Sequence, residues 1–256
     1  PPDGKFDANS LAFTNSPAAF ASTNAMIPGG AYCWGHVAVT KRFNNLAFFK
    51  SADDPADPAP LDAAARARYY ERKVDQLMAG EATSIPGYSN LREFSESPEI
   101  QDYIASKVAH EWARNAWSLQ GVRAIATTGG MSRTRSDELL GKISEKLSHH
   151  QSPEIVITAK GGVIQPSAHV LHATKIIDQG AAGKRICIRD PNFGRSLDGT
   201  GSPAPGFNDN DDCVNFITVA ADGSMKYNAS GYDELGNAMI ADNDEPDTVR
   251  AIRSLR

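Results

Sequence analysis

The sequence is poor in cysteine, carries no long hydrophobic run and has no excess of positive charge. Three cysteines among 256 residues are too few for a disulfide framework. No unbroken apolar run exceeds four residues, whereas a membrane helix needs about 18. The net charge is −5, from 26 lysines and arginines against 31 acidic residues, which argues against a large basic surface for nucleic acid. A disulfide scaffold and an integral membrane protein are therefore excluded, and neither a membrane span nor a nucleic-acid partner is predicted.

What remains is an ordinary globular composition, with 41% hydrophobic and 22% charged residues. The length predicts a single domain over residues 1–256, or a single domain with two lobes. The cysteines Cys33, Cys187 and Cys213 are odd in number, so at most one bridge forms. A Cys187–Cys213 bridge is possible if their strands pair, but two buried thiols are the favoured prediction. The chain begins at Pro1 without a methionine, so we expect processing, which slightly favours a secreted or exported protein.

The first half of the sequence predicts a helical lobe over residues 33–150. Asp62 is placed to cap one helix. Ser97-Pro98-Glu99 is a strong helix start, because it combines a capping serine, a proline in the first turn and an acid. Ser136 begins a further helix. The expected helices span residues 33–49, 63–78, 98–119 and 136–147.

After Pro153 the pattern changes to short segments rich in β-branched residues, which predict a β lobe over residues 151–230. Ala221-Asp222-Gly223 is typical of a hairpin turn, and residues 195–212 form a long loop. A run of helices followed by a run of strands is typical of the α+β class, here with an antiparallel sheet. The expected strands span residues 154–159, 168–177, 184–189, 213–219 and 224–229.

Cys33 follows a glycine turn at Gly29-Gly30 and lies at the start of the first predicted helix. A helix N-terminus carries partial positive charge and unpaired N–H groups, both of which favour a thiolate and hence a nucleophile. The same N–H groups could hold a developing oxyanion. The structural alternative is a buried cysteine beside the buried side chain of Trp34.

Two residues of the second half fit a reactive thiol. His169 enters a predicted strand and Asp190 directly follows another. A neutral imidazole can take the proton of a thiol and return it to a leaving group, and a carboxylate can hold the imidazole in the required tautomer. His172 competes with His169, but the two face opposite ways on a strand because they lie three residues apart. Asn192 competes with Asp190; we favour His169, at the strand start, and Asp190, which ends its strand directly.

Cys33, His169 and Asp190 occur in this order, with separations of 136 and 157 residues from the cysteine. With helices after the cysteine and strands around the other two, the chain resembles the papain-like cysteine peptidase superfamily. It looks most like the bacterial effector (YopT-type) and bacteriocin-processing branches, because the strand with the histidine is followed by one ending in Asp-Pro-Asn-Phe-Gly. The resemblance covers about residues 24–220.

The resemblance implies a papain-like fold of two lobes with the site in the cleft between them. It gives Cys33 the role of nucleophile, His169 that of general base and acid, and Asp190 that of the orienting carboxylate. The family often supplies a Gln or Asn shortly before the cysteine to bind the oxyanion. Position 27, six before the cysteine, is Ile27, so this pattern fails there and Asn24 is a weak substitute.

These roles imply a cysteine-dependent hydrolase, a thiol protease that cleaves a peptide or isopeptide bond through an acyl-enzyme. It would need neither cofactor nor metal, and its partner would be a protein or peptide substrate. The same fold could act as a deamidase or acyltransferase, since only the acyl acceptor changes. It could also be a non-catalytic effector or binding module that uses the acidic loop 205–212 as a contact surface.

A zinc site is a weaker alternative use of the same region. Cys33, His36, His169 and His172 would supply four sulfur and nitrogen ligands. The helical pair could share a face, but the strand pair could not do so without a bulge. The sequence does not indicate the oligomeric state.

Overall fold

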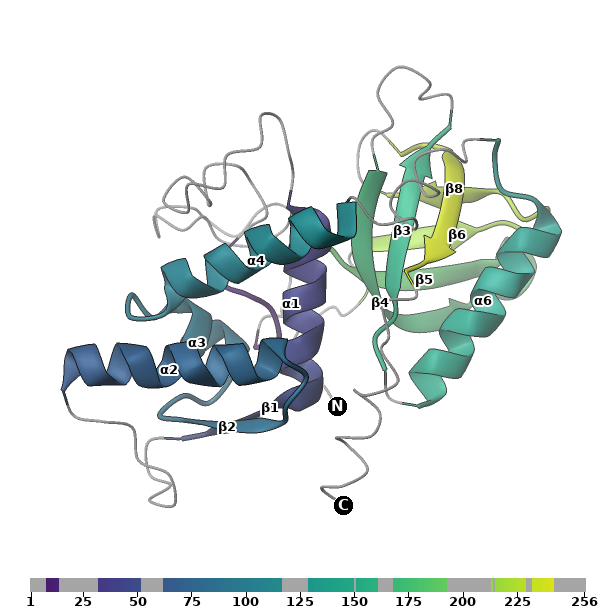
Figure 1. Cartoon of the computed structure of the whole chain (residues 1–256). Helices are drawn as coiled ribbons and strands as arrows, with labels where there is room; N and C mark the ends of the chain where they lie inside the picture. The colour runs from purple at the N-terminus through teal and green to yellow at the C-terminus, as the bar shows by residue number, and fades with distance from the viewer. Residues whose placement is uncertain are drawn as a thin grey trace. The chain divides into compact units, whose positions relative to one another are not determined.

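The computed structural model describes residues 8–13, 32–51, 62–116, 129–149, 151–160, 168–192, 213, 215–228 and 232–241. The chain divides into two compact units (Figure 1). The first is formed mainly by residues up to Trp112, and the second by Ala113–Pro191 together with residues 213–241. Most helices belong to the first unit, whereas a six-stranded sheet dominates the second. The prediction of a mixed α+β chain is confirmed.

The first unit contains a small parallel sheet that the sequence did not predict. Helix α1 ends at Leu46, earlier than expected, because Ala47–Lys50 pairs in parallel with Thr83–Pro86. Asp62 caps α2 as predicted, since its carboxylate accepts a hydrogen bond from the Ala65 N–H at 2.8 Å. The elements are α1 (Cys33–Leu46), β1 (Ala47–Lys50), α2 (Ala63–Met78), β2 (Thr83–Pro86), α3 (Leu91–Glu96) and α4 (Gln101–Ala116).

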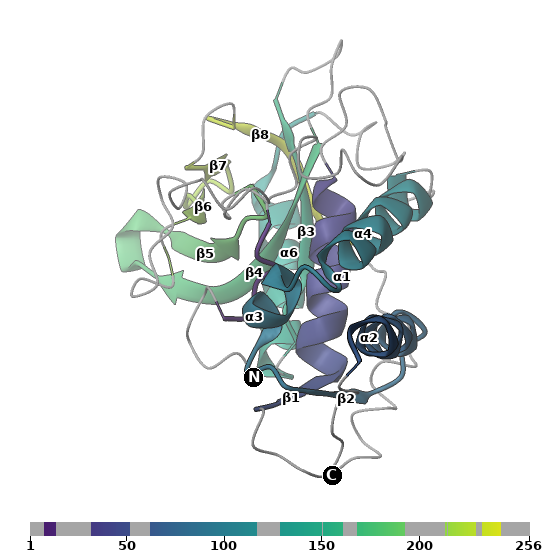
Figure 2. The ribbon, with the colours of Figure 1, turned by 90° about the vertical axis from the view of Figure 1, so that its left-hand side faces the viewer.

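Helix α1 is the centre of this unit, and it is buried on nearly every side. It lies directly against α4 (Figure 2). A Cβ at Gly35 would collide with the carbonyl oxygen of Val108 and lie 2.7 Å from the backbone nitrogen of Trp112. Only glycine lets the two backbones approach this closely. The position of the first turn of α1, which begins at Cys33, therefore depends on Gly35.

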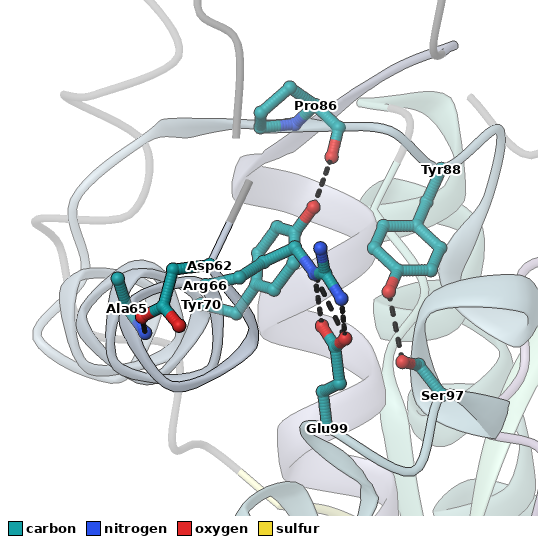
Figure 3. A network of polar contacts seen from close by, with 8 residues as sticks. All are labelled: Asp62, Ala65, Arg66, Tyr70, Pro86, Tyr88, Ser97 and Glu99. Carbon is teal, nitrogen blue, oxygen red and sulfur yellow. Dashed lines mark hydrogen bonds and ion pairs between the residues drawn. The ribbon is translucent and has the colours of Figure 1, made fainter. Parts of the chain in front are cut away.

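A polar network ties α2 to the segments that follow it (Figure 3). The Arg66 guanidinium shares its Nε–H between the two oxygens of the Glu99 carboxylate, at 2.9 and 2.7 Å, and its Nη2 also donates to Oε1. The Tyr70 hydroxyl donates to the carbonyl of Pro86 at 2.9 Å. Burial is the main cause that raises the pKa of Tyr70 to about 12, so this hydroxyl stays protonated and keeps donating at neutral pH. These contacts fix α2 against β2 and the start of α4.

The second unit packs one helix against an antiparallel sheet with the strand order β7-β6-β5-β4-β3-β8. The predicted bounds of β3 and β5 are confirmed, and those of β4 are confirmed to within one residue. Strand β8 was not predicted, and it extends the sheet beyond residue 230 by pairing with β3. The elements are α6 (Arg133–Ser148), β3 (Glu154–Ala159), β4 (Ala168–Asp178), β5 (Lys184–Arg189), β6 (Asn215–Val219), β7 (Met225–Tyr227) and β8 (Leu235–Ile240), with a short 3₁₀ turn at Gly180–Ala182.

The predicted hairpin turn joins β6 to β7 and is anchored to α6. Gly223 has φ +88°, and the Asp222 carboxylate accepts from the Ser224 N–H at 2.9 Å. Helix α6 begins earlier than expected because Ser132, rather than Ser136, caps it. The buried Ser136 instead donates its hydroxyl to the Gly223 carbonyl at 2.6 Å. This contact holds the hairpin against the first turns of α6.

A disulfide joins Cys187 to Cys213, so the prediction of two buried thiols was wrong. Cys187 lies on β5 and Cys213 shortly precedes β6, and these two strands pair. The pairing brings the two Cα atoms to 4.8 Å, within the range that a disulfide spans. Cys33 is left as the one cysteine that keeps its thiol.

Replacing Gly35 with alanine is expected to destabilise the first unit. The added methyl group meets backbone on α4, which cannot move aside cheaply, so the loss should be about 3 kcal/mol or more. Gly141→Ala is the matched control, because Gly141 also lies inside a helix but has open space at its Cβ position; it should stabilise by up to about 1 kcal/mol. Chemical denaturation measures both, and equal effects would contradict the account.

Removing the disulfide is expected to destabilise the second unit. The bridge spans 26 residues, and loop-closure entropy for that length corresponds to about 3.5 kcal/mol. Denaturation of the Cys187→Ala/Cys213→Ala double variant, without reductant, measures the loss. Cys33→Ala is the control, since it removes a buried cysteine but keeps the bridge. A double variant as stable as the control would show that the bridge does not stabilise the fold.

Candidate active site

His169 and Asp190 form a buried pair in the second unit. The imidazole Nε2 lies 2.8 Å from Asp190 Oδ1. The side chain of His169 is 6% exposed and that of Asp190 is 0% exposed. An ionised carboxylate can only accept hydrogen bonds, so Nε2 carries the proton and donates it. The histidine and carboxylate favoured from the sequence therefore lie in direct contact.

A third residue, Tyr227, completes this cluster. Its hydroxyl donates to Asp190 Oδ2, so both carboxylate oxygens receive a hydrogen bond from a described side chain. Burial is the main cause that raises the pKa of Tyr227 far above its ordinary value, and the charge of Asp190 adds to it. The ring of Tyr232 contacts both His169 and Tyr227, with centroid distances of 6.2 and 6.0 Å.

Tyr227 was not picked out from the sequence, although a signal for it exists. It lies two residues after Met225 in the segment predicted as a strand, so both side chains point to the same face of the sheet. The hydroxyl of a buried tyrosine usually finds a hydrogen-bond partner. The pattern marks Tyr227 as such a residue, but it does not reveal that Asp190 is its partner.

The sheet register explains why the three residues meet. His169 pairs with Ile157, and Tyr227 pairs with Ile217. Directly paired residues share a face, and both isoleucines belong to the hydrophobic core beneath α6. Asp190 lies two residues beyond Ile188 of the same core, so it continues on that face. The cluster therefore lies on the face of the sheet that is packed against the core of the unit.

His172 lies on the opposite face of the sheet, as its spacing from His169 predicts. It pairs with Glu154 on β3 and with Arg189 on β5, and all three side chains are buried. The bulge in β4 comes after Ala173, so it does not alter this alternation. Asp190 contacts His169, which favours His169 over His172 as the histidine of a site.

Cys33 is the first residue of α1 in the other unit, as the sequence predicts. The preceding residue, Tyr32, provides no side-chain cap for the helix, and the first turn carries no acidic side chain. The Cys33 residue is 5% exposed. Within α1 itself, no acidic side chain of the first turn therefore opposes negative charge on the sulfur, and the partial positive charge of the helix N-terminus favours it.

Two of the other features that the sequence pointed to fall outside the part of the chain that the structure describes, and a third lies in the other unit. Asn24, the weak oxyanion candidate, and the acidic loop 205–212 lie outside the described residues. His36, a ligand in the zinc alternative, has its Nε2 2.8 Å from the carbonyl of Phe13. Within the ranges that the structure describes, no group of three potential metal ligands occurs.

In chemical terms, the cluster on the sheet is an oriented imidazole. Asp190 fixes the ring through Nε2, which makes Nδ1 the nitrogen suited to accept a proton. When Nδ1 gains a proton, the adjacent carboxylate stabilises the positive charge. An imidazole held in this way has the chemistry that general acid–base catalysis uses.

Comparison with known proteins finds no protein family, no curated protein and no solved structure that matches this chain. No helix in the described ranges is both long enough and apolar enough to cross a membrane.

The hydrogen bond to Asp190 predicts the tautomer of His169. Neutral His169 should carry its proton on Nε2, and Asp190→Ala should abolish that preference because the acceptor is gone. Nitrogen-15 NMR of histidine-labelled protein distinguishes the two tautomers. The exposed His110 on α4 is the internal reference. A His169 ring that carries its proton on Nδ1 would contradict the assignment.

Proposed function

We propose that this protein is a papain-like, cysteine-dependent hydrolase that cleaves a peptide or isopeptide bond. Cys33 is the nucleophile, His169 the general base and acid, and Asp190 the residue that orients the imidazole. The observation that carries the proposal is the buried hydrogen bond between His169 and Asp190. Support also comes from the single unbridged thiol, which lies at the first residue of a helix whose first turn carries no acidic side chain.

In the first half of the reaction, the thiol proton of Cys33 passes to Nδ1 of His169. The thiolate attacks the carbonyl carbon of the scissile bond, and the carbonyl oxygen becomes an oxyanion. Backbone N–H groups at the start of α1, the N–H of Cys33 included, stabilise that charge. As the intermediate collapses, His169 gives its proton to the leaving amine. The product is a thioester between Cys33 and the acyl part of the substrate.

In the second half, a water molecule replaces the amine. His169 takes one proton from the water, and the resulting hydroxide attacks the thioester carbon. Collapse releases the carboxylic acid, and the sulfur leaves as a thiolate that regains its proton from His169. All atoms balance, because one water is consumed and the bond yields one acid and one amine.

The proposal requires the thiol of Cys33 and the ring of His169 to meet during the reaction. The disulfide makes this requirement easy to test, because without reductant Cys33 is the one thiol that iodoacetamide can alkylate. Alkylation is followed by mass spectrometry from pH 5 to pH 10. Wild-type Cys33 should be alkylated readily at pH 6, because the imidazole of His169 takes up the thiol proton.

The decisive comparison is between His169→Gln and His172→Gln, the same substitution on the two faces of β4. His169→Gln should slow alkylation at pH 6 by at least about tenfold and move the profile toward that of a free thiol, since the imidazole no longer stabilises the thiolate. His172→Gln should leave the profile unchanged. Thermal unfolding of each variant confirms that it is folded. Superimposable profiles for all three proteins would refute the thiol–imidazole pair.

The products of turnover identify the reaction. Incubation with a mixture of peptides, with Cys33→Ala as the inactive control, should give shorter peptides. A gain of about one mass unit without cleavage would identify a deamidase, and a crosslinked product an acyltransferase. Removal of the general base should lower the rate by roughly 10²–10⁴-fold. Equal cleavage by wild type and Cys33→Ala would exclude a role for the cysteine.

A further inference from the structure

We propose that Tyr227 is a positioning residue, whose hydroxyl keeps the Asp190 carboxylate ionised and turned toward His169. This inference rests on the function proposed above for its catalytic consequence, though not for its geometry. It assigns a role to a strand residue, on β7, that lies outside the trio of Cys33, His169 and Asp190.

The buried Asp190 carboxylate receives a hydrogen bond at each of its two oxygens. Asp190 has no exposed side-chain surface, so water does not stabilise its negative charge. His169 supplies a donor to Oδ1, and Tyr227 supplies one to Oδ2. Without the Tyr227 donor, the carboxyl group would gain less from ionisation, and a neutral carboxylic acid would orient His169 less strongly.

Backbone contacts fix the position of Tyr227 and of the hairpin that carries it. Its backbone pairs with Ile217 of β6, and its N–H donates to the carbonyl of Tyr232 at 3.1 Å. The hairpin that carries it is fixed to α6 by the hydrogen bond from Ser136 to Gly223. A donor placed on rigid elements fixes its acceptor more accurately than one on a loop.

The phenol of Tyr227 must stay protonated in order to donate to Asp190. A phenolate beside Asp190 would repel the carboxylate and could not donate to it. Burial, followed by the charge of Asp190, keeps the pKa of Tyr227 raised. The hydroxyl therefore remains a donor across the neutral range, where a thiol–imidazole pair operates.

The test compares wild type with Tyr227→Phe, which removes the hydroxyl and keeps the ring. The first readout is the Nε2–H tautomer of His169, followed by nitrogen-15 NMR. We expect the fraction with the proton on Nε2 to fall, and the Nε2–H proton to exchange faster with solvent. A purely structural role would lower the unfolding temperature and leave the tautomer unchanged, and that result would overturn the proposal.

Tyr103→Phe is the matched control. The Tyr103 hydroxyl also donates to a carboxylate, that of Asp75, at 2.8 and 2.9 Å, but the pair is exposed and lies in the first unit. The change therefore removes the same kind of hydrogen bond at a distant position in the sequence. It should leave the tautomer of His169 as it is in the wild type.

A second measurement needs no variant and covers the case in which Tyr227→Phe does not fold. In the wild-type protein, the hydroxyl proton of Tyr227 should give its own downfield resonance, because a buried hydrogen bond to a carboxylate slows its exchange. Tyrosine labelled at the ring carbons assigns it. A hydroxyl proton that exchanges too fast to be seen would refute the hydrogen bond.

The catalytic readout separates this inference from the proposed function. If the enzyme cleaves peptides, Tyr227→Phe should lower kcat by roughly 5- to 30-fold with little change in KM, because it alters the base and not the substrate contacts. A wild type that cleaves nothing, combined with a tautomer that responds to Tyr227, would refute the hydrolase and retain the positioning role. If the wild type cleaves peptides and Tyr227→Phe leaves the tautomer of His169 unchanged, the positioning role is refuted and the hydrolase is retained.

Discussion

A buried carboxylate must receive hydrogen bonds, and that requirement organises the second unit around Asp190. Two described donors come from strands on both sides of β5, with His169 on β4 and Tyr227 on β7. Strand β6 lies between β5 and β7, so only a long side chain spans the additional strand spacing of about 4.8 Å. The hairpin, its anchorage to α6 and the register of the sheet all serve to hold these groups in contact. An imidazole oriented in this way is prepared for proton transfer, which is why the cluster is interpreted as catalytic.

The sequence predicted those features that local chemistry determines. Asp62 caps a helix because its carboxylate reaches an N–H three residues ahead, and Gly223 marks a turn because it adopts a positive φ. Strands such as Glu154–Ala159 were found at their observed bounds from β-branched residues alone. His169 and Asp190 were singled out because His169 lies at the start of a predicted strand and Asp190 directly follows another. In each case a few neighbouring residues carry the information.

Features that depend on distant pairing were missed. Leu235–Ile240 has little β-branched character and becomes a strand because β3 offers it an edge. Ala47–Lys50 forms a strand, and not the end of the predicted helix, because it pairs with Thr83–Pro86. The disulfide follows from the register of β5 and β6, which spacing along the chain does not give. Tyr227 belongs to the same group, since its role depends on a partner 37 residues away.

The central claim is that the thiol of Cys33 and the imidazole of His169 act as one pair, and their mutual electrostatic coupling tests it most directly. The measurement is the titration of the His169 ring by nitrogen-15 NMR in wild type and in Cys33→Ala. A neighbouring thiolate stabilises the imidazolium, so removing Cys33 should move the midpoint of the His169 titration to lower pH. Because such coupling is reciprocal, loss of His169 should move the alkylation profile of Cys33 by a similar amount in the opposite direction, to higher pH. A His169 titration that is the same with and without Cys33 would contradict the claim.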